Sequence, residues 1–429
     1  MPGTHTPAPA TDRPSPLPAR SLPHPSRTRP GNLEFSPFRG VRYAPGHIGS
    51  LESAVASSPS PLASGRTAGP RDLPAHSPRR LLLPDRPSGE PSPAHHGASE
   101  RLRDWLRTDV LRLDPTPVMY AYEQHGPDGP QRGLIAALRL PTRPGRVLPH
   151  RSADPSVAAD RMKRMRMLGA QPEPVLLTHR GGDLVARLLD TVTAGEPLCR
   201  ARTADGARHS LWAVADPGDW DRVNADLSDR RLLIADGHHR YLAYHYLRDR
   251  QIAGATHGPV LLVDETRYPL EPRPLHRVLP GIRLDEFLAS LPDPCALRPV
   301  AGPPGSGAAA LATALDALAA VGADRPACLV GDGLRYLLAT DFEPPGPCPA
   351  VEAAAARPGA PGTEPRLHHD PAGAAADAER SRGTVLIPRA PSYRKVRASA
   401  ENTLLLPNGS LSFAPKPPLG LVLRLLHGV

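Results

Sequence analysis

Proline is the residue that most limits where this chain can fold, because its ring fixes φ and removes a backbone hydrogen-bond donor. Twenty of the 57 prolines lie in the first hundred of the 429 residues. Residues 1–30 and 57–98 also contain much Ser, Gly and Arg and few apolar positions, which is typical of segments that cannot bury a core. We therefore predict a disordered N-terminus over 1–30 and a Pro/Ser-rich low-complexity segment over 57–98.

The remaining residues alternate between strand and helix patterns. Residues 31–56 carry Phe35, Phe38 and Tyr43 and predict a strand and a short helix that pack on the core. The main core is expected over 99–342, followed by a linker or loop over 343–365 and a C-terminal α/β segment over 366–429 that returns to the core. We predict an α/β fold with a mixed, partly parallel sheet and flanking helices.

Several local signals are specific enough to place single elements. Residues 117–140 read as two alternating strands around the turn GPDGP, which predicts a hairpin. Asp154 precedes Pro155 at the start of an amphipathic stretch, which predicts a capped helix. The apolar run RLLIAD, residues 231–236, leads directly into the helical pattern of GHHRYLAYHYLRDR and predicts a strand, a turn and a helix.

Charge and cysteine content narrow the class of protein. The formal net charge is +9, but the basic residues are scattered arginines with only three lysines, and no aromatic residues are interleaved with them. A nucleic-acid interface is therefore not favoured. The four cysteines form no C-x-x-C pair and no zinc spacing, so we expect reduced thiols and no metal site. No run approaches the ~20 apolar residues of a membrane span and no signal peptide is recognisable, so we expect a cytosolic protein with no membrane partner.

The densest polar cluster is IADGHHR, residues 234–240. A turn between a buried strand and a helix directs free backbone N–H groups at one point, where the helix dipole also favours an anion such as phosphate. Gly237 allows a close approach of the backbone, and Arg240 can donate two hydrogen bonds to phosphate oxygens. Asp236, His238 and His239 are the candidate catalytic residues, since imidazoles can move protons near neutral pH.

A purely structural interpretation of the same cluster stays open. In that interpretation Asp236 caps the helix, Gly237 makes the turn and the histidines fill the core. Three other residues are candidate phosphate ligands, and each has a structural alternative. His150 precedes a helix on a loop, Arg39 lies beside aromatic residues, and Lys416 lies between prolines in SFAPKPPLG.

The order of these segments resembles a family. FRGVRYAP, VMYAYEQHG, VLPH, HSLWAVAD, LLIADGHHRY, PLHRVLPG and FAPKPPLGLVLR together are similar to the DUF 1015 family of bacterial and archaeal proteins, which has no assigned activity. The resemblance runs from about residue 32 to the end and is most specific at IADGHHRY. The DGHHR turn in turn looks like the phosphate-binding turn of the ParB/sulfiredoxin superfamily, which includes nucleotide-dependent free serine kinases.

That resemblance implies that Gly237, His238, His239 and Arg240 hold nucleotide phosphates beside the Asp236 carboxylate. It is an analogy at the level of the fold. The chain also departs from the family pattern at three places. Where the family has the stretch V-A-P-P-Y-D-V, this chain reads Val55-Ala56-Ser57-Ser58-Pro59, so the tyrosine and the aspartate are missing. Arg151 follows His150 where the family has a carboxylate, and Gly409 lies where a lysine is expected. A phosphoryl transfer needs a base and cations, so these departures affect the reaction first.

Three hypotheses follow. The first is an enzyme that binds a nucleotide, with Mg²⁺, or a phosphorylated small molecule at the DGHHR turn and transfers phosphate to a small amino or hydroxy acid. The second is a degenerate relative that keeps the pocket for ligand sensing or partner binding. The third is a ParB-like nucleic-acid-associated protein, which net charge and the superfamily analogy alone support. The sequence does not identify the substrate, the oligomeric state or the role of residues 57–98.

Overall fold

The computed structural model describes residues 31–53, 73–82, 94–143, 145–291, 297–300, 307–321, 325, 327–340, 365–406 and 409–426. The disorder predicted over 1–30 lies outside these ranges, as do the linker predicted over 343–365, apart from its last residue, and most of the low-complexity segment predicted over 57–98. Within 57–98 the structure describes a 3-10 helix, Pro78–Leu81, and the start of α1, Ala94–Arg107. Cys199 and Cys328 are free thiols, and the other two cysteines are not among the described residues.

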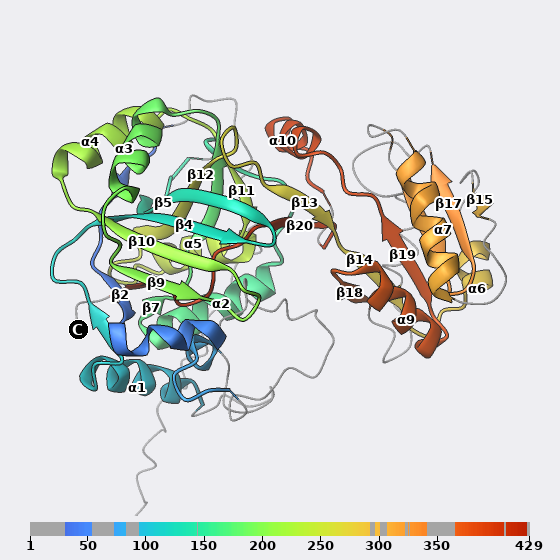
Figure 1. The fold of residues 1–429 in the computed structure, drawn as a ribbon, viewed down its shortest axis with the longest axis horizontal. Coiled ribbons are helices and arrows are strands. Elements are labelled where there is room, and N and C mark those ends of the chain that lie inside the picture. The colour runs from blue at the N-terminus through green and yellow to red at the C-terminus, as the bar shows by residue number, and fades with distance from the viewer. Residues whose placement is uncertain are drawn as a thin grey trace, which may run out of the picture.

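The described chain forms a larger and a smaller body (Figure 1). The larger body is built on a nine-stranded sheet with the order β6-β11-β8-β12-β5-β4-β10-β9 and with β1 beside β5. These strands are β6 (Val147–Pro149), β11 (Leu232–Asp236), β8 (Val175–His179), β12 (His257–Asp264), β5 (Gly129–Arg139), β4 (Met119–Gly126), β10 (Arg208–Val214), β9 (Cys199–Arg202) and β1 (Phe35–Ser36).

The direction of the strands makes this sheet mixed. β11 runs parallel to β6, β12 runs parallel to β8, and all other neighbours are antiparallel. The parallel pairing expected beside β11 therefore exists on one side only. β4 and β5 form the predicted hairpin. The prediction of an α/β fold with a mixed, partly parallel sheet and flanking helices is confirmed.

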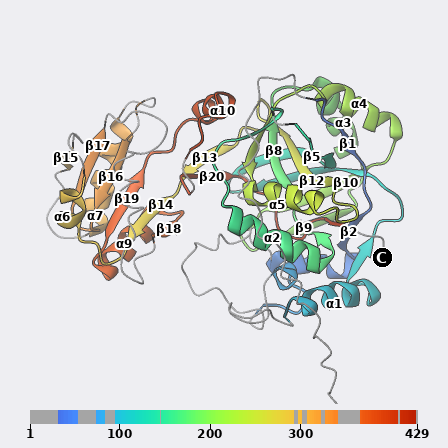
Figure 2. The ribbon, with the colours of Figure 1, turned by 180° about the vertical axis from the view of Figure 1, so that it is seen from behind.

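Helices cover this sheet, and two of them hold the region of interest. Figure 2 shows α5 (His238–Asp249) beside α2 (Pro155–Leu168) over one face. α2 begins as predicted, because the Asp154 carboxylate accepts the backbone N–H of Ser156 at 2.7 Å and Pro155 follows the cap. α3 (Asp183–Thr193) and α4 (Pro217–Leu227) lie at one end of the sheet. None of the helices in the described ranges is long and apolar enough to cross a lipid bilayer.

Two small sheets bring distant parts of the chain together. A four-stranded sheet has the order β3-β2-β21-β7, and a two-stranded ribbon pairs β13 with β20. A 3-10 helix, Pro45–Ser53, follows β2. The strands are β2 (Gly40–Tyr43), β3 (Leu111–Leu113), β7 (Ala170–Gln171), β13 (Glu271–Pro274), β20 (Leu411–Ala414) and β21 (Leu423–Leu425).

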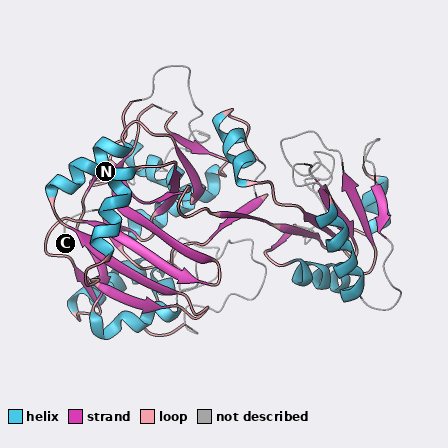
Figure 3. Cartoon of the chain, turned by 45° about the horizontal axis from the view of Figure 1, so that its top comes forward, coloured by secondary structure: helices cyan, strands magenta, loops and turns pink. Residues whose placement is uncertain are grey.

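The smaller body has its own sheet and core. Its six strands have the order β15-β17-β16-β19-β14-β18, with helices α6 (Leu284–Ala289), α7 (Gly307–Ala320) and α9 (Pro371–Ser381), while α10 (Tyr393–Glu401) leads back to the larger body. The strands are β14 (His276–Leu279), β15 (Leu297–Val300), β16 (Ala327–Gly331), β17 (Tyr336–Thr340), β18 (Arg366–His368) and β19 (Thr384–Pro388). Figure 3 shows strands flanked by helices in both bodies. Strands from both sides of the predicted linker share this sheet, whereas the domain limits proposed above divide them.

Candidate functional site

The turn between β11 and α5 has the geometry that an anion-binding turn requires. β11 is buried up to Asp236, Gly237 follows with φ of 97°, and α5 begins at His238. A side chain at position 237 would be strained by this φ, and its Cβ would lie 3.2 Å from Nε of Arg240. Gly237 offers no side-chain cap to the first turn of α5. Position 237 therefore provides no side-chain oxygen that could accept a hydrogen bond from the N–H groups at the start of this helix.

Sheet topology brings other segments to the same edge. β6 runs parallel to β11 with Pro149 opposite Ile234, so His150 lies at the end where β11 stops. β8 runs antiparallel to β11 with Leu176 opposite Asp236, so the segment that enters β8, with Glu173, lies there too. Lys416 follows β20 and is held in place by the amide of Gln131, which donates to the carbonyl of Pro415 at 3.1 Å.

Arg240 is committed to contacts within the protein. Its guanidinium bonds the Asp236 carboxylate, donates to the carbonyl of Pro174 at 2.5 Å and lies 3.3 Å from a carboxylate oxygen of Glu173. Only 9% of its side chain is exposed. These contacts tie the start of α5 to the entry of β8. That Arg240 binds phosphate directly stays a prediction from the sequence.

Asp236 is held as a carboxylate by surrounding cations. Its other oxygen accepts from Nζ of Lys416 at 3.1 Å. Burial alone would raise the pKa of Asp236, but Lys416, Arg240 and Arg151 outweigh it, so the pKa lies below the ordinary value. A carboxylate with a lowered pKa and two bonded cations is a poor general base at neutral pH.

Two further arginines add positive charge to this group. Arg151 and Arg161, which are both half-buried, interact electrostatically with Asp236, and Arg161 also with Glu173. Burial lowers the pKa of both guanidinium groups. No hydrogen bond or ion pair joins Arg161 to the part of the chain that the structure describes. Four cationic side chains thus surround two carboxylates at the start of α5.

A small pocket opens at this group. Its polar lining comes from Asp236, Arg240, Lys416 and Glu173, and its apolar lining from Leu176 and the prolines at 174, 417 and 418. Charged groups thus lie beside an apolar wall. Such a lining suits a ligand that has an anionic part and an uncharged part.

The histidines of the site are neutral at pH 7. Nδ1–H of His150 donates to the carbonyl of Ile234 at 2.7 Å, and the backbone N–H of His150 donates to Nε2 of His238 at 3.3 Å. Burial is the main cause that lowers the pKa of His150 to about 3, of His239 to about 4, and of His238 well below its ordinary value. Nε2 of His150, Nδ1 of His238 and Nε2 of His239 are buried without a hydrogen-bond partner among the described residues.

The structure brings together most of the residues that the sequence singled out. Asp236 to Arg240, His150 and Lys416 meet at one edge of the sheet. Arg39 does not join them, because it is exposed and its Nε donates to the carbonyl of Asp114 at 2.7 Å. No group of His, Cys, Asp and Glu side chains in the described ranges is arranged to hold a metal ion.

Three charged residues of this site were not among the candidates named from the sequence. Glu173 lies next to Arg240, but nothing in its local pattern indicates a partner so far along the chain. Arg161 is one of several arginines on α2, and its local pattern does not distinguish it from the others. Arg151 was visible only as a departure from the family pattern, and its position beside Asp236 shows that this departure adds a cation to the site.

Comparison with known proteins identifies the family. Residues 35–339 match the family described as "Protein of unknown function (DUF1015)". The chain belongs to this family. The match includes every site residue of the larger body except Lys416, which lies beyond its end. No curated protein matches this DUF1015 chain.

Three solved structures are similar to parts of this DUF1015 protein. A free serine kinase in complex with AMP has a TM-score of 0.36 and 14% identity, over 64% of this chain and 89% of that chain. SbnI with a C-terminal truncation, from Staphylococcus aureus, has a TM-score of 0.37 and 13% identity, over 68% and 87%. A conserved hypothetical protein from Pyrococcus furiosus has a TM-score of 0.35 and 15% identity, over 65% and 92%.

Proposed function

We propose that the pocket at the start of α5 binds the phosphate groups of a small molecule such as a nucleotide. The observation that carries this proposal is the excess of positive charge. Arg151, Arg161, Arg240 and Lys416 lie around Asp236 and Glu173, and burial lowers the pKa of Arg151 and of Arg161. A bound phosphate would offset the free-energy cost of burying these cations, since a half-buried cation is stabilised by an adjacent anion.

The roles of the cations differ in this proposal. Lys416 and Arg161 bind the phosphate directly, together with backbone N–H groups of the first turn of α5. Arg240 acts through Asp236 and Glu173, whose positions it fixes. The uncharged part of the ligand lies against Leu176 and the prolines at 417 and 418. Any Mg²⁺ would arrive with the nucleotide, since phosphate oxygens supply its ligands.

Phosphoryl transfer is a second, finer candidate, and His239 is the observation that favours it. Its Nε2 has no hydrogen-bond partner among the described residues, and burial, Arg151 and Arg161 lower its pKa to about 4. A phosphate bound between the two arginines would neutralise their effect and raise this pKa toward the range of a general base. If the protein does not catalyse this transfer, the same pocket would bind the ligand in a protein that senses it.

Matched substitutions on α2 test the binding proposal. Calorimetry with AMP, ADP and ATP, with and without Mg²⁺, should show affinity in the wild type that falls about tenfold or more in Arg161→Gln and Lys416→Gln. Arg164→Gln is the control, because Arg164 is exposed on the same helix. Equal affinity in Arg161→Gln and the wild type would contradict the proposal. An equal loss in Arg164→Gln would indicate unspecific attraction by net charge.

Two further measurements test the transfer step. Loss of the γ- or β-phosphate of the bound nucleotide should be followed by phosphorus NMR in the presence of small amino and hydroxy acids. His239→Gln should abolish turnover without changing nucleotide affinity more than about twofold. The imidazole resonance of His239 should titrate at higher pH when nucleotide is bound. Binding without any turnover would favour the ligand-sensing alternative.

A further inference from the structure

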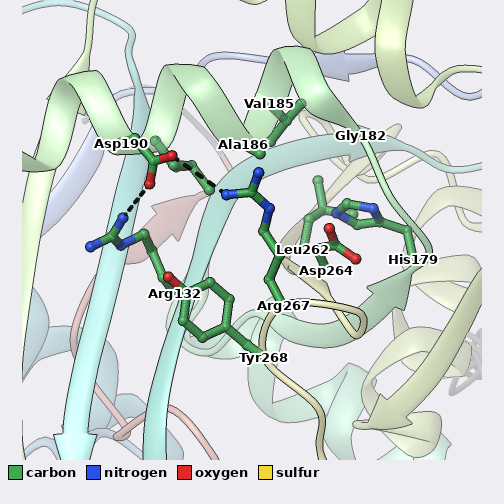
Figure 4. A pocket seen from close by; sticks show the side chains of 11 residues that line it. Arg132, His179, Gly182, Val185, Ala186, Asp190, Leu262, Asp264, Arg267 and Tyr268 are labelled. Carbon is green, nitrogen blue, oxygen red and sulfur yellow. Dashed lines mark hydrogen bonds and ion pairs between the residues drawn. The ribbon is translucent and has the colours of Figure 1, made fainter.

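A second pocket lies at the opposite edge of the same sheet (Figure 4). β8 pairs antiparallel with β11, and Leu176, near the start of β8, lies opposite Asp236. His179, at the other end of β8, lines the second pocket and is about 10 Å further along the strand. Leu262 and Asp264 reach the same pocket from β12, which runs parallel to β8. This pocket is therefore separate from the phosphate site.

Asp264 supplies an acidic group to this pocket. Its Oδ1 accepts from the backbone N–H of Gly181 at 3.0 Å, and from the backbone N–H and the hydroxyl of Thr266 at 3.0 and 2.8 Å. No lysine, arginine or histidine in the described ranges forms an ion pair with Asp264. The nearby arginines are engaged by Asp190, at 2.7 Å from Arg132 and 3.4 Å from Arg267 (Figure 4). Oδ2 of Asp264 thus remains available to a cation.

His179 supplies a second acceptor. Only 2% of this residue is exposed, and its Nδ1–H donates to the carbonyl of Gly181 at 2.7 Å. The lone pair is therefore on Nε2, for which the described residues provide no hydrogen-bond donor. Burial lowers the pKa of His179, so the ring stays neutral at pH 7. Nε2 of His179 is not among the buried side-chain atoms without a partner, so it can accept from a ligand in the pocket that His179 lines.

An anion is not the expected occupant. The first turn of α3 is adjacent, but the Asp226 carboxylate already accepts the backbone N–H of Val185 at 3.0 Å. Apolar side chains form one wall of the pocket, from Val185, Ala186 and Leu189 on α3 and Leu262 on β12, and the paired side chains of Arg132, Arg267 and Asp190 line it together with Tyr268. A carboxylate, an imidazole acceptor and an apolar wall in one small pocket fit the cationic group of a small organic molecule.

We propose that this pocket binds the ammonium group of a small primary amine. The ammonium group donates to Oδ2 of Asp264 and Nε2 of His179, and the hydrocarbon part lies against the wall formed by α3 and Leu262. A primary ammonium group has three donors and no acceptor, which matches two acceptors side by side. Both simple alkylamines and amino acids carry this group, and in an amino acid the carboxylate would lie toward Arg267.

The experiment is binding of butylamine to the full chain, followed through the amide resonances of Gly181 and Thr266. Saturable binding is expected in the wild type, while 1-butanol and butyrate should leave these resonances unchanged. Asp264→Asn keeps an oxygen for Gly181 and Thr266 but removes the charge, and should weaken binding about tenfold or more. Asp160→Asn, an exposed carboxylate on α2, should bind as the wild type does.

Other outcomes decide the proposal as clearly. Ala186→Leu fills the pocket without changing a polar group and should also remove binding, so the test remains valid if Asp264→Asn does not fold. 2-Aminopentanoic acid separates the two sources of the ammonium group. Tighter binding than butylamine indicates an amino acid, and weaker binding an alkylamine. The proposal would be overturned if neither butylamine nor 2-aminopentanoic acid bound saturably. It would also be overturned if 1-butanol bound as well as butylamine, or if both variants kept the wild-type affinity. Nucleotide affinity should be the same in all these variants.

Discussion

The start of α5 and the start of α3 are both reached through glycine at positive φ, but different charges surround them. Each helix follows a buried strand of the same sheet through glycine at positive φ, Gly237 before α5 and Gly181 and Gly182 before α3. At α3 the Asp226 carboxylate from α4 accepts an N–H of the first turn. At α5 the nearby charges are mainly cations. The comparison shows that a strand-glycine-helix unit offers N–H groups, and that distant residues decide whether a protein carboxylate or a ligand accepts from them.

Arg240→Met should give the largest effect. It removes the cation that joins Asp236 and Glu173, and breaking a buried ion pair on one side costs about 3 kcal/mol in the free energy of unfolding. Arg161→Gln, by contrast, should change stability by less than about 0.5 kcal/mol while it weakens nucleotide binding. Urea unfolding of both variants measures this difference. Equal stability of the two would mean that the division into positioning and ligand-binding cations is wrong.

Asp226→Ala should make the start of α3 more like that of α5. The variant loses a cap and the ion pair with Arg230 at 2.8 Å, at a cost of about 2 kcal/mol. Its exposed N–H groups and Arg230 should then bind an anion. Sulfate should raise the Tm of Asp226→Ala more than that of the wild type, relative to sodium chloride of equal ionic strength. The same response in both proteins would show that Asp226 does not exclude anions.

His150→Asn should reduce the loss of stability at acid pH that the buried imidazoles at the start of α5 cause. Burial lowers the pKa of His150 to about 3, below the ordinary value that it takes in the unfolded chain. The unfolded chain therefore binds one more proton between these two pKa values, and the free energy of unfolding falls as pH decreases through this range.

Asparagine keeps a donor for Ile234 but does not titrate. The slope of stability against pH should decrease by about 1.4 kcal/mol per pH unit near pH 5, measured by urea unfolding at pH 7, 6 and 5. His150→Leu is the control, because it should show the same slope with lower stability at pH 7. A wild-type slope in His150→Asn would mean that His150 is protonated in the folded protein at pH 5.

Elements with strong short-range signals were predictable from the sequence. The strand and helix on either side of Gly237, the capped start of α2 at Asp154 and the β4-β5 hairpin are all present. Arg39 shows the limit of this reasoning. The sequence offered it as a candidate phosphate ligand beside aromatic residues, but pairing of β2 with β3 places its side chain at the carbonyl of Asp114.

The sequence by itself determined the turn at Gly237, because an apolar run, a residue without Cβ and a helical pattern act over a few positions. It also marked His150 and Lys416 as candidates. Only the tertiary structure decided that Glu173 lies beside Arg240 and that Lys416 bonds Asp236. It also decided that the Asp226 carboxylate accepts an N–H at the start of α3. Electrostatic energy depends on distance and burial, and both are set when strands from distant parts of the chain pair in one sheet.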